Sequence, residues 1–290
     1  MKIRWFFIIA VVFVFVSIAL PVAAEGGKSV DVRVMTYNIQ AGMGADGQYD
    51  PDAIADVIKE SQAEVVALQE VDVHWGARSQ FENVVDRLAD QLDMDYTFAP
   101  IYDNPPLEEN GPRQQFGVAI MSKYPILKET NQEITRLSTQ DASPEPTLTP
   151  GFAEAIINVQ GSLIPFYSTH LDYRGDPYIR EMQVDDMLQI FEEQPGSKVL
   201  MGDMNASPEA NELRPLLEKF TDVWNTVNTT PGYTYPSLNP NNRIDHIYAS
   251  DDIEVLDAHL IQSEASDHLP VIADLSVERG NNGEILKGSD

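Results

Sequence analysis

The amino-acid sequence predicts a protein of the α/β class. Short apolar or alternating runs rich in β-forming residues, typical of strands, recur along the chain. Segments with apolar residues at helical spacing, such as 51–61 and 79–92, stand between several of these runs. No internal repeat or clear linker interrupts the 290 residues, so they suit one large domain or two small ones. Strands interleaved with helices are the pattern of α/β proteins.

The first half of the chain is predicted to carry two helices between strands. Segment 31–39 alternates and predicts a strand, and 63–71 is a short apolar run that predicts a buried one. Pro51 opens a helix over 51–61. The helix over 79–92 places five apolar residues on one side: Phe81, Val84, Val85, Leu88 and Leu92.

In the second half of the chain, predicted strands again alternate with predicted helices. Strands are predicted at 116–122 and 152–171, and the second folds back at a tight turn over Gln160-Gly161-Ser162. A helix over 177–194 precedes a strand over 198–205, and Pro215 is expected to break a helix over 208–220. The remaining elements are late strands at 243–250, 253–261 and 269–277 and polar loops at 102–115, 138–151 and 225–242.

Residues 1–24 have the pattern of a secretion signal. Lys2 and Arg4 precede a long apolar run, and Val22 and Ala24 supply the small residues before a cut, so the mature chain would begin at Glu25. The alternative is an uncleaved membrane anchor, although the apolar run is shorter than the ~20 residues of a spanning helix. A short leader over 25–30, a domain over 31–278 and a disordered tail over 279–290 are expected to follow.

Composition restricts the chemistry. The chain has no cysteine, which excludes disulfides and thiolate metal sites, so a metal would be held by oxygen or histidine ligands. Such ligands favour Mg²⁺, Mn²⁺ or Ca²⁺. The formal net charge of -27 is opposite to that of a generic nucleic-acid binder.

Polar residues gather at the ends of the predicted strands. One such residue alone is usually a turn former or a helix cap. Six strand ends, however, carry an acid, an amide or a histidine: Asn38; Gln69 and Glu70; His170 and Asp172; Asp203 and Asn205; Asp245 and His246; Asp267 and His268. Strand ends along one edge of a sheet are a usual place for sites, and clustered acids repel each other unless a cation or a proton intervenes. The pattern therefore predicts a hard-cation site with acid–base groups beside it.

The motifs "TYNI", "LQEVD", "GVAIMSKYPI", "STHLD", "MGDMNASP", "RIDHIYAS" and "SDHLPV" follow in this order along the chain. In this order they resemble the endonuclease/exonuclease/phosphatase superfamily, over about residues 31 to 278. The resemblance implies a two-sheet β-sandwich flanked by helices, in four layers α/β/β/α, with the site at one end. It also implies a phosphoric ester hydrolase that depends on Mg²⁺ or Mn²⁺.

The resemblance implies a role for each matching residue. Asn38 and Glu70 resemble the metal-binding pair, with Glu70 the principal ligand, and Asp267 resembles a second acid on the metal side.

His268 resembles the catalytic histidine, and Asp245 the carboxylate that holds its ring. His170 resembles the donor to the phosphate or the leaving oxygen. Asp203 resembles the residue that orients or activates water, and Asn205, two positions on, the one that holds phosphoryl oxygens. Strand alternation makes His246 point away from the site.

The sequence specifies the substrate less closely than it specifies the type of reaction. The loops at 102–115, 138–151 and 225–242 have few residues suited to a bilayer and no basic cluster for duplex DNA. Arg113 and Arg174 are the preferred candidates for phosphate contacts, with structural ion pairs as the alternative. We expect a secreted, monomeric phosphodiesterase without stable membrane insertion after cleavage. The alternatives are a secreted nuclease, which the acidic charge disfavours, a lipid phosphodiesterase, a small-molecule phosphatase, and a catalytically idle binding protein of the same fold.

Overall fold

A computed structural model of the chain describes residues 29–280 and residue 285. The predicted signal segment 1–24 therefore lies outside the described residues, as does most of the predicted tail. Ile285, within that tail, is buried against Ile156 and Leu163. Among the described residues, no helix has the length and apolarity needed to cross a membrane.

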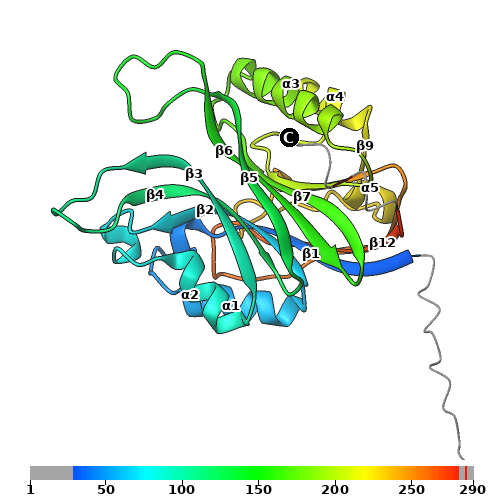
Figure 1. The fold of residues 1–290 in the computed structure, drawn as a ribbon, viewed down its shortest axis with the longest axis horizontal. Helices are drawn as coiled ribbons and strands as arrows, with labels where there is room; N and C mark the ends of the chain where they lie inside the picture. The colour runs from blue at the N-terminus through cyan, green and yellow to red at the C-terminus, as the bar shows by residue number, and fades with distance from the viewer. Residues whose placement is uncertain (1–28, 281–284, 286–290) are drawn as a thin grey trace, which may run out of the picture.

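Two six-stranded mixed sheets form the centre of the molecule (Figure 1). The first has the order β11-β12-β1-β2-β4-β3. Its strands are β1 (Ser29–Asn38), β2 (Val65–Val73), β3 (Asp95–Asn104), β4 (Gln114–Ser122), β11 (Ile253–Leu260) and β12 (Val271–Glu278). The second has the order β5-β6-β7-β8-β10-β9. Its strands are β5 (Ile126–Arg136), β6 (Thr147–Val159), β7 (Ser162–His170), β8 (Val199–Asp203), β9 (Phe220–Asp222) and β10 (Asp245–Ser250).

Helices cover the outer face of each sheet, which confirms the predicted four layers (Figure 1). The α-helices are α1 (Pro51–Ser61), α2 (Val84–Leu92), α3 (Tyr178–Glu193), α4 (Arg214–Leu217) and α5 (Val223–Val227). Short 3₁₀ turns are η1 (Gln40–Gly42), η2 (Ala77–Ser79) and η3 (Asn211–Leu213). α1 and α2 pack on the first sheet, and α3 and α4 pack on the second.

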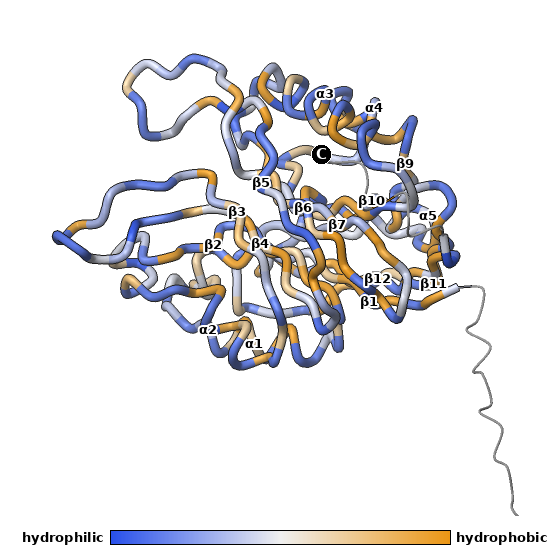
Figure 2. Tube along the Cα trace, viewed as in Figure 1, coloured by the Kyte–Doolittle hydropathy of each residue, from blue (hydrophilic) through white to orange (hydrophobic). Residues whose placement is uncertain are grey.

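Apolar side chains fill three layers of packing. Apolar side chains from the inner faces of both sheets, mostly valine, isoleucine and alanine, form the central core, which also includes Phe166 and Met201. In Figure 2 the hydrophobic colour follows the strands, while the outer loops are hydrophilic. Because both faces of the central strands are covered, β2 is buried along nearly its whole length rather than at alternate residues.

Capping residues set the starts of the two helices on the first sheet. Asp50 accepts a hydrogen bond from the backbone N–H of Ala53 at 3.2 Å, and Pro51 occupies the first turn of α1. Asn83 accepts one from Asp86 N–H at 3.2 Å, so α2 begins at Val84 and not at residue 79. Phe81, predicted on the apolar side of this helix, precedes it and is 45% exposed. That part of the prediction is wrong because the Asn83 cap starts the helix after it.

Other differences concern elements at the sheet margins. β3 and β5 were not predicted as strands, and β9 and α5 were also absent from the prediction. β6 begins at Thr147, inside the predicted loop 138–151. The break expected at Pro215 is confirmed, because the segment divides into η3 and the four-residue α4, with Pro215 in its first turn.

Strand register brings the predicted site residues to one end of the sandwich. β1 and β2 are parallel and end together, with Asn38 opposite Gln69. β7 and β8 are parallel and end with His170 opposite Asp203. β10 runs antiparallel to β8 and starts with Asp245 opposite Asp203. The ends of both sheets therefore contribute to the same region.

Candidate functional site

Asp203 lies at the centre of the converging side chains. Its Oδ2 atom accepts a hydrogen bond from Asn38 Nδ2 at 3.0 Å and lies 3.5 Å from His170 Nε2 and 3.9 Å from His268 Nε2. Its Oδ1 atom accepts the backbone N–H of Asn205 at 2.9 Å. Asp203 is 1% exposed, so one carboxylate links residues from both sheets in a region shielded from bulk water.

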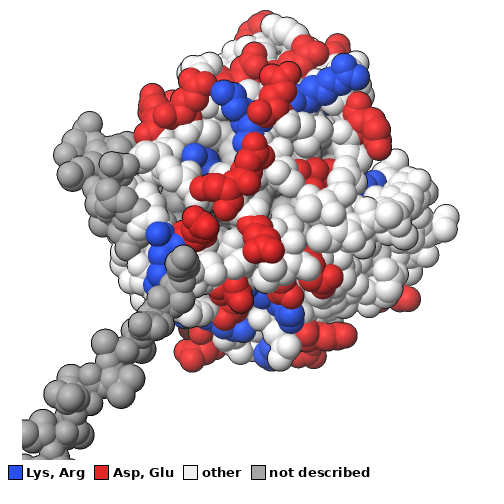
Figure 3. Space-filling view, turned by 90° about the vertical axis from the view of Figure 1, so that its right-hand side faces the viewer, with Lys and Arg blue, Asp and Glu red and all other residues white. Residues whose placement is uncertain are grey.

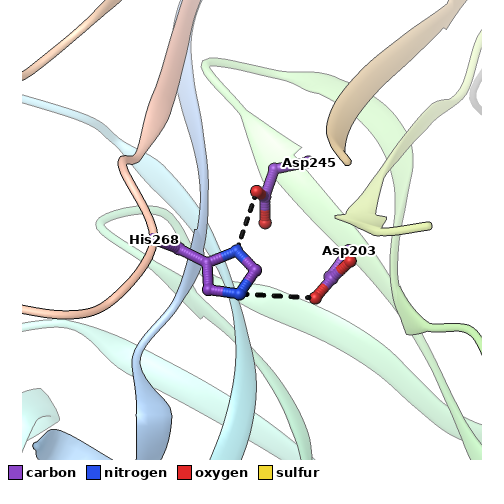
Figure 4. A group of neighbouring side chains, drawn as sticks. All are labelled: Asp203, Asp245 and His268. Carbon is purple, nitrogen blue, oxygen red and sulfur yellow. Dashed lines mark hydrogen bonds and ion pairs between the residues drawn. The ribbon is translucent and has the colours of Figure 1, made fainter. Parts of the chain in front are cut away.

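His268 and Asp245 form a second buried pair beside it (Figure 4). His268 Nδ1 lies 2.9 Å from Asp245 Oδ2, and Thr234 Oγ1 donates to the same oxygen at 2.5 Å. Burial alone would lower the pKa of His268, but attraction to Asp245, helped by Asp203 and Asp267, raises it to about 10. The ring of Tyr235 packs on the imidazole at a centroid distance of 4.7 Å. The ring orientation is therefore fixed from two sides.

Close contact between β7 and β8 sets the position of Asp203. A Cβ atom on Gly202 would lie 2.3 Å from the backbone oxygen of Thr169. Only glycine lets the two strands approach this closely just before the strand ends that carry His170 and Asp203. Met204, which follows Asp203 in the chain, is fully buried in the core under α3.

Two site residues adopt left-handed backbone conformations. Glu70 has φ 54° and lies where the pairing of β2 with β4 is interrupted by a bulge between Leu68 and Val71. Asn205 has φ 49° and lies past the end of β8, so simple strand alternation does not extend to it. Its side-chain Nδ2 donates to the backbone oxygen of Leu171 at 3.0 Å.

The residues predicted to hold a metal lie together at this end of the first sheet. Burial raises the pKa of Asp267, and the negative charge of Glu70 raises it further against the opposing effect of His268. Among the described residues, the only side-chain donor to Glu70 is Asn38 Nδ2, at 3.3 Å. Two neighbouring carboxylates with few donors fit a hard divalent cation such as Mg²⁺ or Mn²⁺. Asn38 turns its nitrogen toward Glu70 and Asp203, and its oxygen accepts the Gln40 N–H at 3.1 Å.

A cluster of three side chains could also offer ligand atoms. One atom from each of Asp203, Asp245 and His268 lies within 4.8 Å of the other two. In this structure the Asp245 carboxylate is engaged by His268 and Thr234, which is the arrangement of a carboxylate that orients a histidine.

The two arginines predicted for phosphate contacts are engaged by carboxylates. Arg113 donates to Asp103 Oδ1 at 2.6 Å on the exposed β3–β4 hairpin. Arg174 pairs with Asp172 and also donates to the backbone oxygen of Leu137 at 3.3 Å. Both therefore have the structural ion pairs that the sequence left as the alternative.

His246 turns away from these groups. It is 2% exposed, its Nε2 lies 3.0 Å from the backbone oxygen of Ala206, and its ring stacks on Tyr248 at 5.4 Å. Desolvation and the positive charge of Arg243 lower its pKa to about 4. It is a core residue of the second sheet.

Several contributors were missed from the sequence. Thr234 holds Asp245, and Ser266 donates from Oγ to the backbone oxygen of Asn38 at 2.7 Å, joining the last loop to β1. Arg136 donates to the backbone oxygen of His170 at 3.2 Å. Ser266 begins the motif "SDHLPV" and Thr234 lies in the predicted loop 225–242, but nothing in the sequence pattern shows which residues they contact. Arg136 carries no sequence signal at all.

Residues 35–268 match the model of the endonuclease/exonuclease/phosphatase family. No curated protein matches the chain.

Several solved structures are similar. An endonuclease/exonuclease/phosphatase from Beutenbergia cavernae has 23% identity and a TM-score of 0.70, covering 86% of this chain and 72% of that one. A mannosyl-6-phosphatase from Bacteroides thetaiotaomicron has 15% identity and a TM-score of 0.67, covering 84% and 99%. The human nocturnin catalytic domain has 21% identity and a TM-score of 0.61, covering 84% and 93%. At these identities the structures establish a shared fold, and the family model covers most of the chain. The chain therefore belongs to the endonuclease/exonuclease/phosphatase family.

Proposed function

We propose that the chain is a secreted, divalent-metal-dependent phosphoesterase that hydrolyses phosphodiester bonds by in-line attack of water. The observation that carries the proposal is the convergence of Asn38, His170 and His268 on one carboxylate oxygen of Asp203. Family membership supports phosphoester chemistry, and the two carboxylates Glu70 and Asp267 support a hard cation.

Each of the site's side chains has a separate role in phosphoryl transfer. Asp203 orients the attacking water through Oδ2, the oxygen on which Asn38, His170 and His268 converge, while its Oδ1 is held by the Asn205 N–H. His170 donates to the phosphoryl group or the leaving oxygen. Since Asp245 engages Nδ1 of His268, Nε2 is the ring atom left to exchange a proton with the reacting groups.

A divalent ion, when bound, would neutralise charge on the phosphoryl oxygens. Glu70 and Asp267 would hold it, and Asn38 would steady Glu70 and Asp203 through its amide. Asn205 contributes its backbone N–H to Asp203 and its side chain to the loop at Leu171, which keeps the two strand ends together.

The acidic surface favours a small substrate over a polymer. The net charge is -27, and on the face shown in Figure 3 acidic side chains are scattered widely, with basic ones among them. A polyanion such as DNA usually needs several basic contacts, and these would have to overcome long-range repulsion.

A substrate panel tests the proposal. Purified mature chain would be assayed with a chromogenic phosphodiester, the matching monoester, plasmid DNA, RNA and sphingomyelin, each with Mg²⁺, Mn²⁺ or chelator. We expect metal-dependent cleavage of the small diester above the monoester and the polymers. Preferential cleavage of sphingomyelin, nucleic acid or the monoester would contradict the assignment as a small-molecule phosphodiesterase and identify the preferred substrate instead. Inactivity on all five substrates would favour a binding protein of the same fold.

Export is tested separately. N-terminal sequencing of material outside the cytoplasmic membrane should begin near Glu25. An intact Met1 would indicate the membrane anchor instead.

A further inference from the structure

A pocket opens directly beside the candidate site. It has a volume of about 220 Å³, and Glu70 and His170 form one side of it. Tyr102, Phe116 and Tyr173 form an aromatic side, and Arg136 also lines it. Pockets that enclose a drug-sized ligand occupy roughly 300–1,000 Å³, so this one suits a part of a small substrate.

Tyr102 and Phe116 are held in place by neighbouring groups, whereas Tyr173 is 65% exposed. Tyr102 stacks with Trp75 at 6.0 Å and with Phe116 at 6.3 Å between ring centroids. The hydroxyl of Tyr102 also lies 2.9 Å from Thr139 Oγ1 and accepts the Thr139 N–H at 2.8 Å. These contacts join the β3–β4 hairpin of one sheet to the β5–β6 hairpin of the other, so both sheets build the pocket.

Arg136 has an unusual set of partners for an enclosed guanidinium. Its terminal nitrogens donate to the backbone oxygens of His170 at 3.2 Å and Gly151 at 2.7 Å. Its Nε has no hydrogen-bond partner, and no carboxylate of the described residues lies within ion-pair distance of it. Nε of Arg243 also has no partner among the described residues, but the buried arginines Arg180 and Arg243 each pair with a carboxylate, at 2.8 and 2.7 Å, and Arg136 does not.

The surroundings hold the guanidinium at the pocket. A Cβ atom on Gly151, where φ is 123°, would lie 2.4 Å from Ile101 and 3.1 Å from two nitrogens of Arg136. Glycine therefore leaves room for the guanidinium at this point. Asp172 is near enough to favour the charged form, but it is already paired with Arg174, and desolvation lowers the pKa of Arg136 to about 10. The side chain remains a cation at neutral pH.

We propose that Arg136 and this aromatic pocket bind a second anionic group of a small organic phosphate ester, next to the phosphate held at Asp203 and His170. Arg136 is half-buried and pairs with no carboxylate of the described residues, so an anionic oxygen in the pocket would supply a counter-ion to a partly desolvated cation. This inference rests on the proposed phosphoesterase and names its substrate class. The pocket volume and the acidic surface favour a small molecule over a nucleic-acid strand.

Binding of matched phosphates tests the subsite without turnover. Calorimetry with saturating Mg²⁺ would compare methyl phosphate with 2-phosphoglycolate, ethylene glycol bisphosphate and the dinucleotide pTpT. We expect 2-phosphoglycolate or the bisphosphate to bind about 10- to 100-fold more tightly than methyl phosphate, the range of a charge-assisted hydrogen bond. Equal affinities for all four would overturn the inference, and a preference for pTpT alone would assign the pocket to nucleic acid.

Variants then assign the preference to one side chain. Arg136→Gln should reduce the affinity ratio to below about threefold, Arg136→Lys should keep part of it, and Arg214→Gln, an exposed arginine on α4, should keep all of it. A ratio unchanged in Arg136→Gln would show that another group binds the anion. If that variant does not fold, the native ratio and the Arg136→Lys ratio decide.

Turnover of methyl p-nitrophenyl phosphate separates this inference from the proposed function. If the chain hydrolyses this diester but binds all the probes equally well, the proposed phosphoesterase activity is supported and the anion subsite is contradicted. If the chain binds the doubly anionic probes more tightly through Arg136 but hydrolyses nothing, the subsite is supported and the proposed activity is contradicted.

Discussion

Nδ1 of His268 lies 2.9 Å from Oδ2 of Asp245, which leaves Nε2 on the side of Asp203. His268→Ala should lower kcat by roughly 10²-fold or more, as loss of an acid–base group does. Asp245→Asn should also be severe, because an amide no longer fixes the ring as a carboxylate does. Steady-state rates on a small diester measure both changes.

His246→Asn is the matched control, since this histidine packs in the core and turns away from the site. Its rate should stay within a few-fold of the native chain at a temperature where the variant is folded. An active His268→Ala together with an inactive His246→Asn would show that the wrong histidine has been assigned.

Metal removal should abolish activity, because the acids proposed to hold the cation are oxygen donors and the chain has no thiol. Activity should return with Mg²⁺ or Mn²⁺, and Glu70→Gln should raise the Mg²⁺ concentration needed for half-maximal rate while lowering the rate. Titration of the chelated enzyme with each ion measures this. Full activity in chelator would exclude the proposed mechanism.

Acid should destabilise the fold through His246. Its pKa is lowered to about 4 in the fold, whereas an unfolded histidine titrates near 6.5. Between these values the unfolded chain binds a proton that the folded chain does not, so the free energy of unfolding falls as pH decreases from 6.5 to 4, by up to roughly 3 kcal/mol. Urea unfolding across this range measures the slope, and His246→Asn should flatten it. An equal slope in the variant would place the effect on other groups.

Salt should separate polymeric from small substrates. Repulsion from a chain of net charge -27 slows the approach of a polyanion most at low ionic strength, where screening is weakest. Any cleavage of plasmid DNA should therefore rise as salt is first added, while hydrolysis of a small diester changes little. Initial rates at constant free Mg²⁺ measure the trend. Efficient nicking at low salt that declines steadily with added salt would reveal a basic groove and a nuclease.

Periodicity predicted the α/β class and most of the central strands and amphipathic helices, whereas the four layers were implied by the family resemblance. β3 and β5 could not be predicted, since each lies at the edge of its sheet. The burial of β5 alternates between exposed and half-buried positions along most of its length, so the apolar signal is weak. Phe81 shows a different limit: helical spacing extended the prediction through a residue that the Asn83 cap leaves outside the helix.

Which strand ends meet could be predicted better than how their side chains are oriented. The acids, amides and histidines stand in motifs, and parallel strand pairs carry them to one end of the sandwich. The pocket beside them depends on Tyr102, Phe116 and Arg136, which come from three strands and share no motif. Contacts between the hairpins of two sheets decide that arrangement, and such contacts leave no local pattern in a sequence.

Because Glu70 has a left-handed backbone conformation, the side chain proposed to be needed for activity lowers the stability of the fold at this position. A side chain at φ 54° costs roughly 1–2 kcal/mol that glycine does not incur. Glu70→Gly should therefore melt at a higher temperature than Glu70→Ala, while both lose the metal-dependent rate. Equal melting temperatures would mean that the bulge holds this conformation without strain. A higher melting temperature for the glycine variant would mean that the backbone favours glycine at the position where the proposed metal binding requires glutamate, so that stability and activity oppose each other there.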